Sequence, residues 1–169
     1  MDTKIFVTFM RHGRSLADDE EVHEGRYDSP LTDVGRDQVR KRAQAWLESE
    51  VRFDLIITST LMRACESAQI IGDVLGIPVE TDPDWMELNN GPLAGLKWDF
   101  AEKHYPQPDF RNPYEPFWET GESNWEVYRR AARAVESVIR RGPGRYLVIA
   151  HGGILNDALR TVIGSGPSI

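Results

Sequence analysis

Two histidines come directly after hydrophobic runs that are far apart in the chain. His12 follows the run at residues 5–10, and His151 follows the run at residues 146–150. A neutral imidazole is a nucleophile, whereas a protonated imidazole can neutralise charge on a phosphoryl group during transfer. A lone histidine is more often structural, but a pair accompanied by arginines favours phosphoryl chemistry. We expect His12 to be the nucleophile and His151 to be a second catalytic contact.

Arginines accompany these histidines in the two places where an anion would need them. Arg11 directly precedes His12, and Arg63 falls at the start of a predicted helix. If Thr60 caps that helix, the cation opposes the helix dipole at a cost of about 0.3–1 kcal/mol. A bound dianion would offset this cost, and a planar guanidinium can hold two phosphate oxygens at once. We therefore expect Arg11 and Arg63 to bind phosphate.

Glu87 is the candidate proton donor for such a reaction, because a leaving alkoxide needs a proton. It lies among apolar residues in the segment 85–91. Without that context it would be an ordinary loop carboxylate. Gly152 is expected at the first turn of a helix after His151, where free backbone N–H groups favour an anion.

The hydrophobic periodicity predicts alternating strands and helices. Strands are expected at residues 5–10, 53–58 and 146–150, and helices at residues 32–50, 61–75, about 127–142 and 154–163. Such alternation predicts a mostly parallel sheet with helices on both faces, that is, an α/β fold in the form of a three-layer αβα sandwich. Ligands of open α/β sheets bind beyond the carboxyl ends of the strands. The histidines and arginines are therefore expected to meet at one edge.

Two segments do not fit this alternation. Residues 106–121 are rich in proline and aromatic side chains, which predicts an irregular excursion that could cover the site. The acidic run at residues 18–21 is interpreted as a solvated loop rather than a metal site.

Composition narrows the class of protein. A chain of 169 residues with 40% hydrophobic and 28% charged residues suits one domain spanning 1–169. The single cysteine, Cys65, excludes an internal disulfide and a thiolate zinc cage. A net charge of −7 argues against binding to nucleic acids or acidic membranes. No apolar run approaches the roughly 20 residues of a membrane helix. We expect a soluble, cytoplasmic protein.

The motifs together resemble the histidine phosphatase superfamily, the phosphoglycerate mutase-like proteins. Arg11-His12-Gly13 is similar to the signature that follows the family's first strand, and His151-Gly152 is similar to its second histidine motif. The other landmarks, in chain order, are Asp28-Ser29-Pro30-Leu31-Thr32 with Gly35; Ser59, Leu61, Arg63, Ala64, Ser67 and Ala68; Glu87 with Gly91, Leu93 and Gly95; and Gly121-Glu122-Ser123. This resemblance spans nearly the whole chain.

The resemblance implies a phosphohistidine mechanism without a metal or other cofactor. His12 would attack phosphorus, and Glu87 would protonate the leaving group and then activate water. Arg11, Arg63 and His151 would hold the phosphoryl oxygens. The resemblance also assigns polar contacts to Ser15 and Ser123. The implied partner is a small phosphorylated substrate, and the oligomeric state cannot be read from the sequence.

Three positions depart from the family's pattern. Mutases usually carry an arginine directly after the catalytic glutamate and an aromatic residue two positions later, where this chain has Leu88 and Asn90. Many members have an asparagine at the position of Asp18, whose carboxylate would repel a dianion. The edge strand that usually follows the last helix is also absent, so the sheet is expected to lack it.

Four readings remain open. A phosphatase is favoured, and a phosphoglycerate mutase is the nearest rival, distinguished by isomer exchange instead of phosphate release. A non-catalytic phosphate-binding protein of the same fold would have no need of Glu87. A metal-dependent hydrolase would lose activity on chelation.

Overall fold

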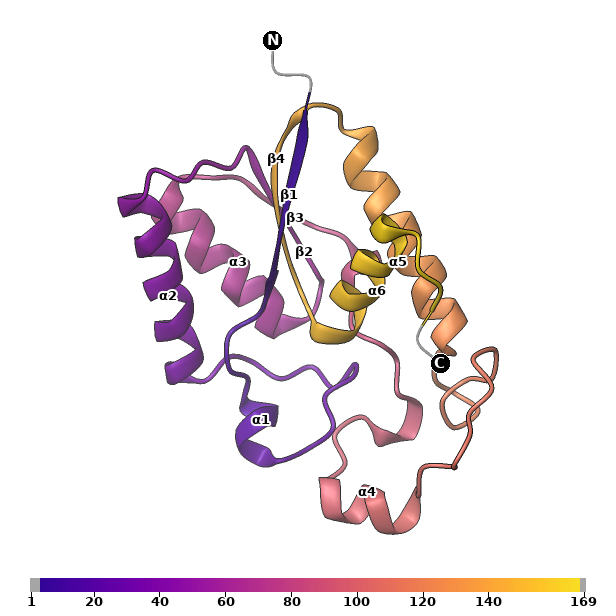
Figure 1. Ribbon diagram of the computed structural model, residues 1–169. Coiled ribbons are helices and arrows are strands. Elements are labelled where there is room, and N and C mark those ends of the chain that lie inside the picture. The colour runs from indigo at the N-terminus through magenta and orange to yellow at the C-terminus, as the bar shows by residue number, and fades with distance from the viewer. Residues whose placement is uncertain (1–3, 168–169) are drawn as a thin grey trace.

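A four-stranded parallel sheet forms the centre of the molecule (Figure 1). In the computed structural model, which describes residues 4–167, the strands are β1 (Ile5–Arg11), β2 (Leu55–Thr58), β3 (Val79–Thr81) and β4 (Gly144–Ala150). Their order is β1-β4-β2-β3, and all pairings are parallel. β4 lies between two neighbours and is buried from Tyr146 to Ala150. Burial of successive residues is typical of a strand that is covered on both faces.

Helices α2 (Asp33–Glu48) and α3 (Met62–Leu75) cover one face of the sheet (Figure 1). Their inward side chains form one core cluster with the sheet, which contains Val39, Ala43, Ala68, Ile71, Ile56, Leu147 and Ile149. Thr32 caps α2, because its hydroxyl accepts a hydrogen bond from the Gly35 N–H. Gly76 ends α3 in the left-handed conformation, which glycine adopts without strain.

Helices α5 (Asn124–Arg140) and α6 (Gly152–Ile163) cover the opposite face (Figure 1). A second core cluster joins them to the sheet and includes Val127, Ala131, Ala134, Val138, Ile154, Ile57, Val148 and the fully buried Trp85. The three-layer αβα arrangement is thus confirmed. Within residues 4–167, no helix is long and apolar enough to cross a membrane.

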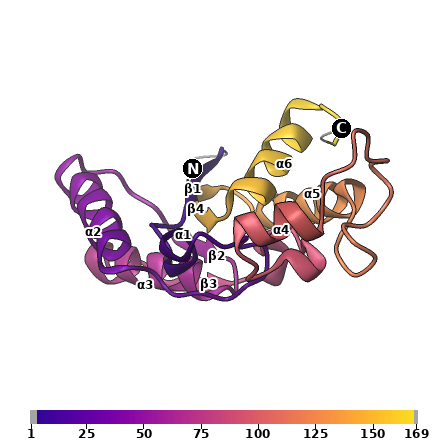
Figure 2. The ribbon, with the colours of Figure 1, turned by 90° about the horizontal axis from the view of Figure 1, so that it is seen from below.

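Short elements lie beyond the carboxyl ends of the strands. They are α1 (Leu16–Glu20), α4 (Trp98–His104) and two 3-10 turns at Pro83–Trp85 and Gly91–Leu93. Figure 1 shows α1 and α4 below the sheet, and Figure 2 views the molecule from this end. These elements surround the edge at which the histidines leave the sheet.

The main elements lie within a few residues of the predicted ranges, and residues 106–121 contain no helix or strand, as expected. The predicted cap of α3 was wrong, because Leu61 and not Thr60 is the N-cap residue. The Asp28 carboxylate accepts a hydrogen bond from the Met62 N–H at 2.7 Å, so a side chain that is distant in the sequence caps this helix. The sequence analysis also missed β3, α1 and α4, which have three, five and seven residues.

Leu147 tests the central core. Its side chain is fully buried in β4, so Leu147→Ala should lower the free energy of unfolding by about 2–5 kcal/mol in urea denaturation. Val34→Ala, at a 58% exposed position of α2, is the matched control and should stay within about 0.5 kcal/mol. Equal effects of the two substitutions would contradict the described core.

Candidate active site

The pairing of β1 with β4 brings the two histidines together. Arg11 is in register with Ala150, so His12 and His151 leave neighbouring strands at the same level. The His12 backbone N–H still donates to the Ala150 carbonyl at 3.1 Å. The two imidazole rings lie 5.0 Å apart between centroids and are tilted by 56°. The expected meeting of these side chains is therefore present.

His12 is held in the tautomer that a nucleophile needs. Its Nδ1 lies 2.7 Å from the Gly13 carbonyl, which can only accept, so Nδ1 carries the proton and Nε2 keeps its lone pair. Burial lowers the pKa of His12 to about 4, and this effect outweighs the hydrogen bond to Gly13 and the Glu24 carboxylate, which raise it. At neutral pH the ring is uncharged and Nε2 is nucleophilic.

Position 13 has no room for a side chain, so only glycine can occupy this turn. A Cβ at position 13 would lie 2.6 Å from the Gly35 carbonyl oxygen. The Gly13 N–H donates to the Ser67 hydroxyl at 3.1 Å, which ties the turn to α3. The backbone that carries His12 is thereby held by β4 through the Ala150 carbonyl and by α3 through Ser67.

His151 is fully buried and has one unused polar atom. Its Nε2 lies 2.8 Å from the Ser59 hydroxyl, whereas its Nδ1 is buried without a hydrogen-bond partner. Burial, reinforced by the charge of Arg63, lowers the pKa of His151 well below its usual range. His151 is therefore neutral, whereas the sequence analysis considered a protonated ring. As a neutral ring it would offer a phosphoryl oxygen one Nδ1–H donor and no positive charge.

Arg63 approaches His12 from the first turn of α3. Its guanidinium is fully buried, and its Nη atoms donate to the Tyr27 and Gly25 carbonyls, each at 2.9 Å. These bonds direct Nε towards His12 Nε2, at 3.2 Å. Burial lowers the pKa of Arg63, and the neighbouring carboxylates oppose this shift. Both Nη atoms of the guanidinium therefore fix the side chain, and they are not free to hold two phosphate oxygens.

Glu24 lies among these groups, and the sequence analysis did not identify it. Its Oε1 is 3.3 Å from Arg63 Nε, and its Oε2 is 3.5 Å from Arg11 Nη2 and 3.7 Å from His12 Nε2. The Ser15 hydroxyl also contacts this carboxylate. The donors expected for phosphate thus converge on Glu24. No sequence motif distinguishes it from the other acidic residues of the segment.

The carboxylate of Glu87, which belongs to the loop after β3, lies against the N-terminus of α6. Its carboxylate accepts hydrogen bonds from the Gly153 N–H at 3.0 Å and the Ile154 N–H at 3.1 Å. A Cβ at Gly153 would lie 2.5 Å from Glu87 Oε1, so only glycine permits this approach. Because His151 is the N-cap residue of α6, the carboxylate and the second imidazole serve the same helix end.

A buried arginine holds the Glu87 loop in place. Arg130 of α5 is 6% exposed and donates to the carbonyls of Asp84, Met86 and Glu87. It also forms two hydrogen bonds with the Glu122 carboxylate. Burial raises the pKa of Glu122, but Arg130, the Asn89 N–H and Arg26 together outweigh this effect, and the net shift of the pKa is downward. No local sequence pattern predicts this role for Arg130, because its carbonyl partners lie about 44 residues away in the chain.

The remaining predicted contacts have different positions. Ser15 caps α1 and touches Glu24, so it lies at the site. Asp18 accepts hydrogen bonds from the Ser15 N–H and hydroxyl, which explains a carboxylate there as part of a helix cap.

The Ser123 hydroxyl caps α5 in a capping box with Glu126, so a phosphate contact from Ser123 stays a prediction. Gly152 is the first residue of α6, where backbone N–H groups have no acceptor within the helix.

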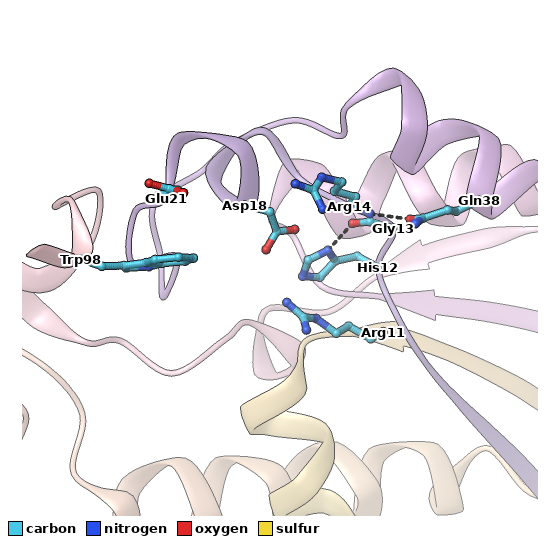
Figure 3. Close-up of a pocket in the computed structure, with 8 residues that line it drawn as sticks. All are labelled: Arg11, His12, Gly13, Arg14, Asp18, Glu21, Gln38 and Trp98. Atoms are coloured by element: carbon cyan, nitrogen blue, oxygen red, sulfur yellow. Dashed lines mark hydrogen bonds between the residues drawn. The ribbon is translucent and has the colours of Figure 1, made fainter.

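A cavity of about 510 Å³ opens beside His12 (Figure 3). Its lining residues are Arg11, His12, Gly13, Arg14, Asp18, Glu21, Gln38 and Trp98. Figure 3 shows the Trp98 indole across the cavity from His12 and Arg11. The aromatic side chain of this wall belongs to α4, and none of the lining residues of this cavity belongs to the segment 106–121. Among the described residues, no three side chains of the His, Cys, Asp and Glu types converge as a metal ion requires.

The chain is similar to known proteins over nearly its whole length. The family model described as "Histidine phosphatase superfamily (branch 1)" matches residues 7–169. The chain is 32% identical to the "Probable phosphoglycerate mutase GpmB" of Yersinia enterocolitica, over 95% of this chain and 76% of that protein. It is 29% identical to the "Uncharacterized phosphatase PhoE" of Bacillus subtilis, over 96% of this chain and 80% of that protein.

Solved structures show the same fold. Bacillus stearothermophilus YhfR superposes with a TM-score of 0.84 at 27% identity, covering 97% of this chain and 82% of the other. A putative alpha-ribazole-5'-P phosphatase from Escherichia coli superposes with a TM-score of 0.84 at 22% identity, covering 96% and 82%. At 22% identity the similarity is evidence of fold alone.

Arg63→Lys tests the geometry of the guanidinium. A lysine has a single ammonium group and cannot donate to both carbonyls while facing His12. We expect inorganic phosphate to bind at least about tenfold more weakly in isothermal titration calorimetry, equivalent to about 1.4 kcal/mol. Arg40→Lys, at an exposed arginine of α2, should bind phosphate as the wild type does. Unchanged affinity in Arg63→Lys would contradict the assignment.

Proposed function

The chain belongs to the histidine phosphatase superfamily, and we propose that it hydrolyses a small phosphomonoester through a phosphohistidine on His12, without a metal. Glu87 is the general acid and base of this reaction. The observation that carries the proposal is the pair of neutral, buried imidazoles. One presents an unprotonated Nε2 beside a buried guanidinium, and the other has a buried Nδ1 with no partner.

The first step forms a bond between His12 Nε2 and phosphorus. The bond from phosphorus to the ester oxygen breaks, and the leaving oxygen takes a proton from Glu87. Arg11, Arg63 and the Nδ1–H of His151 stabilise the phosphoryl oxygens as charge shifts during the transfer. Ser15 and the Gly152 backbone are further candidates for these contacts.

The second step is the hydrolysis of phospho-His12. Glu87 takes a proton from water while the water oxygen attacks phosphorus, and the bond from phosphorus to Nε2 breaks. Inorganic phosphate leaves, and His12 and Glu87 return to their starting protonation states. The backbone N–H groups of Gly153 and Ile154 keep the Glu87 carboxylate in position for both transfers.

A phosphoglycerate mutase is the second candidate, because the Yersinia relative bears that name. The residues after Glu87 disfavour it for this chain. Leu88 packs against the core, and Asn90 is 8% exposed and lies against Gly25. Neither side chain carries a positive charge for the carboxylate of a phosphoglycerate. We therefore favour hydrolysis over isomer exchange.

The substrate is proposed to be a small phosphorylated molecule in the cytoplasm. The cavity beside His12 has room for a leaving group of metabolite size. The net charge of −7 disfavours nucleic acids and acidic membranes as partners.

Product analysis tests the proposed function. A panel of phosphomonoesters that includes 3-phosphoglycerate is incubated with the enzyme in excess chelator, and inorganic phosphate and isomers are measured. We expect phosphate release that the chelator does not diminish and that His12→Ala abolishes. His104→Ala, which changes an exposed histidine of α4, is the control and should remain active. Formation of 2-phosphoglycerate without phosphate would support the mutase, and activity lost on chelation would support a metal enzyme.

A further inference from the structure

The carboxylate of Glu24 occupies the point on which the phosphate donors converge. We propose that Glu24 determines which protonation state of the phosphoryl group the site accepts. The site takes the monoanion, whose P–OH donates a hydrogen bond to Glu24, and discriminates against the dianion. This inference rests on the proposed function, because it concerns the same phosphate site.

The contacts of Glu24 place it inside the phosphate site and not at its rim. One carboxylate oxygen contacts Arg63 Nε and the Ser15 hydroxyl, and the other faces Arg11 Nη2 and His12 Nε2. Only 16% of the Glu24 side chain is exposed. A phosphoryl group close enough to His12 for attack must therefore lie within contact distance of this carboxylate.

A carboxylate in this position interacts with the two forms of a phosphomonoester in opposite ways. A dianion has only acceptor oxygens, so its approach brings like charges together. A monoanion has one P–OH, and a hydrogen bond from a hydroxyl to a carboxylate is short and strong. The second ionisation of a phosphomonoester lies near pH 6, so the two forms interchange within an accessible pH range.

The charged groups around Glu24 allow this effect to be measured. Glu24 faces Arg11 at the end of β1, His12 in the following turn and Arg63 on α3. The carboxylates of Glu87 and Asp28 act in turn on Arg63, whose pKa they raise. Arginine stays protonated across the physiological range. Burial lowers the pKa of His12 to about 4 and also lowers the pKa of His151. In the free site the imidazoles are therefore neutral between pH 5 and 8, whereas phosphate changes its charge within this range.

A purely structural role for Glu24 predicts something different. The carboxylate would then serve only to balance the buried charge of Arg63, and it would move aside for either form of phosphate. Replacement by glutamine would lower stability without changing how phosphate affinity depends on pH. The pH dependence of binding separates the two roles.

The experiment is calorimetric titration of the enzyme with inorganic phosphate at half-unit intervals from pH 5 to 8. Wild type, Glu24→Gln and Glu102→Gln are compared, and Glu102 is an exposed glutamate of α4 that supplies the same change in net charge. The second ionisation of inorganic phosphate lies near pH 7, so if only the monoanion binds, affinity at pH 8 is lower than at pH 5 by about tenfold in total, because the competent fraction falls in that ratio. We expect this fall in wild type and Glu102→Gln. In Glu24→Gln we expect a change of less than about threefold over the same range and tighter binding than wild type at pH 8.

Parallel pH curves for wild type and Glu24→Gln would overturn the inference, and so would wild-type affinity that is constant or rises towards pH 8. The second outcome needs no variant, so the inference stays testable even if Glu24→Gln does not fold. Phosphate binding is measured without turnover. A protein that binds phosphate in the expected manner but hydrolyses no ester would contradict the proposed function and leave the selection by Glu24 intact.

Discussion

The parallel pairing of β1 with β4 is the constraint on which the site depends. Because Arg11 and Ala150 are in register, the chain leaves both strands at the same level and places His12 beside His151. A shift of register by one residue would turn each side chain to the other face of the sheet. The register therefore determines on which side of the sheet His12 leaves β1 and, with it, the distance between the imidazoles.

Burial determines the electrostatics of the site. Transfer from water disfavours the charged form of an imidazole, so both histidines are neutral, as a nucleophile and a neutral hydrogen-bond donor require. Arg63 cannot lose its charge in this way and instead needs partners, which it finds in two carbonyls and the Glu24 carboxylate. The same carboxylate then shapes the environment of any phosphoryl group beside His12. Stability of the buried cation and selection of the ligand's charge thus depend on one side chain.

Local patterns were sufficient for the elements that carry His151 and Arg63, because β4 is an uninterrupted apolar run and α3 has helical periodicity and ends at Gly76. They were insufficient wherever the relevant partner is distant in the chain. Asp28 serves the start of α3 from another segment, Glu24 becomes part of the site only when α3 delivers Arg63, and Arg130 reaches the Glu87 loop across the fold. Short elements such as α4 span too few residues for periodicity to show, so Trp98 was not anticipated in the wall of the cavity.

The position of the phosphoryl group on the enzyme tests the account most directly. The enzyme is mixed with a substrate ester, quenched in alkali to preserve phosphohistidine, and examined by peptide mass spectrometry and ³¹P NMR. Nδ1 donates to the Gly13 carbonyl, so Nε2, which accepts a hydrogen bond from Arg63 Nε, is the ring nitrogen that has a lone pair, and the phosphoryl group should be found on Nε2 of His12. Phosphate on Nδ1, on His151 or on no residue during steady turnover would contradict the account.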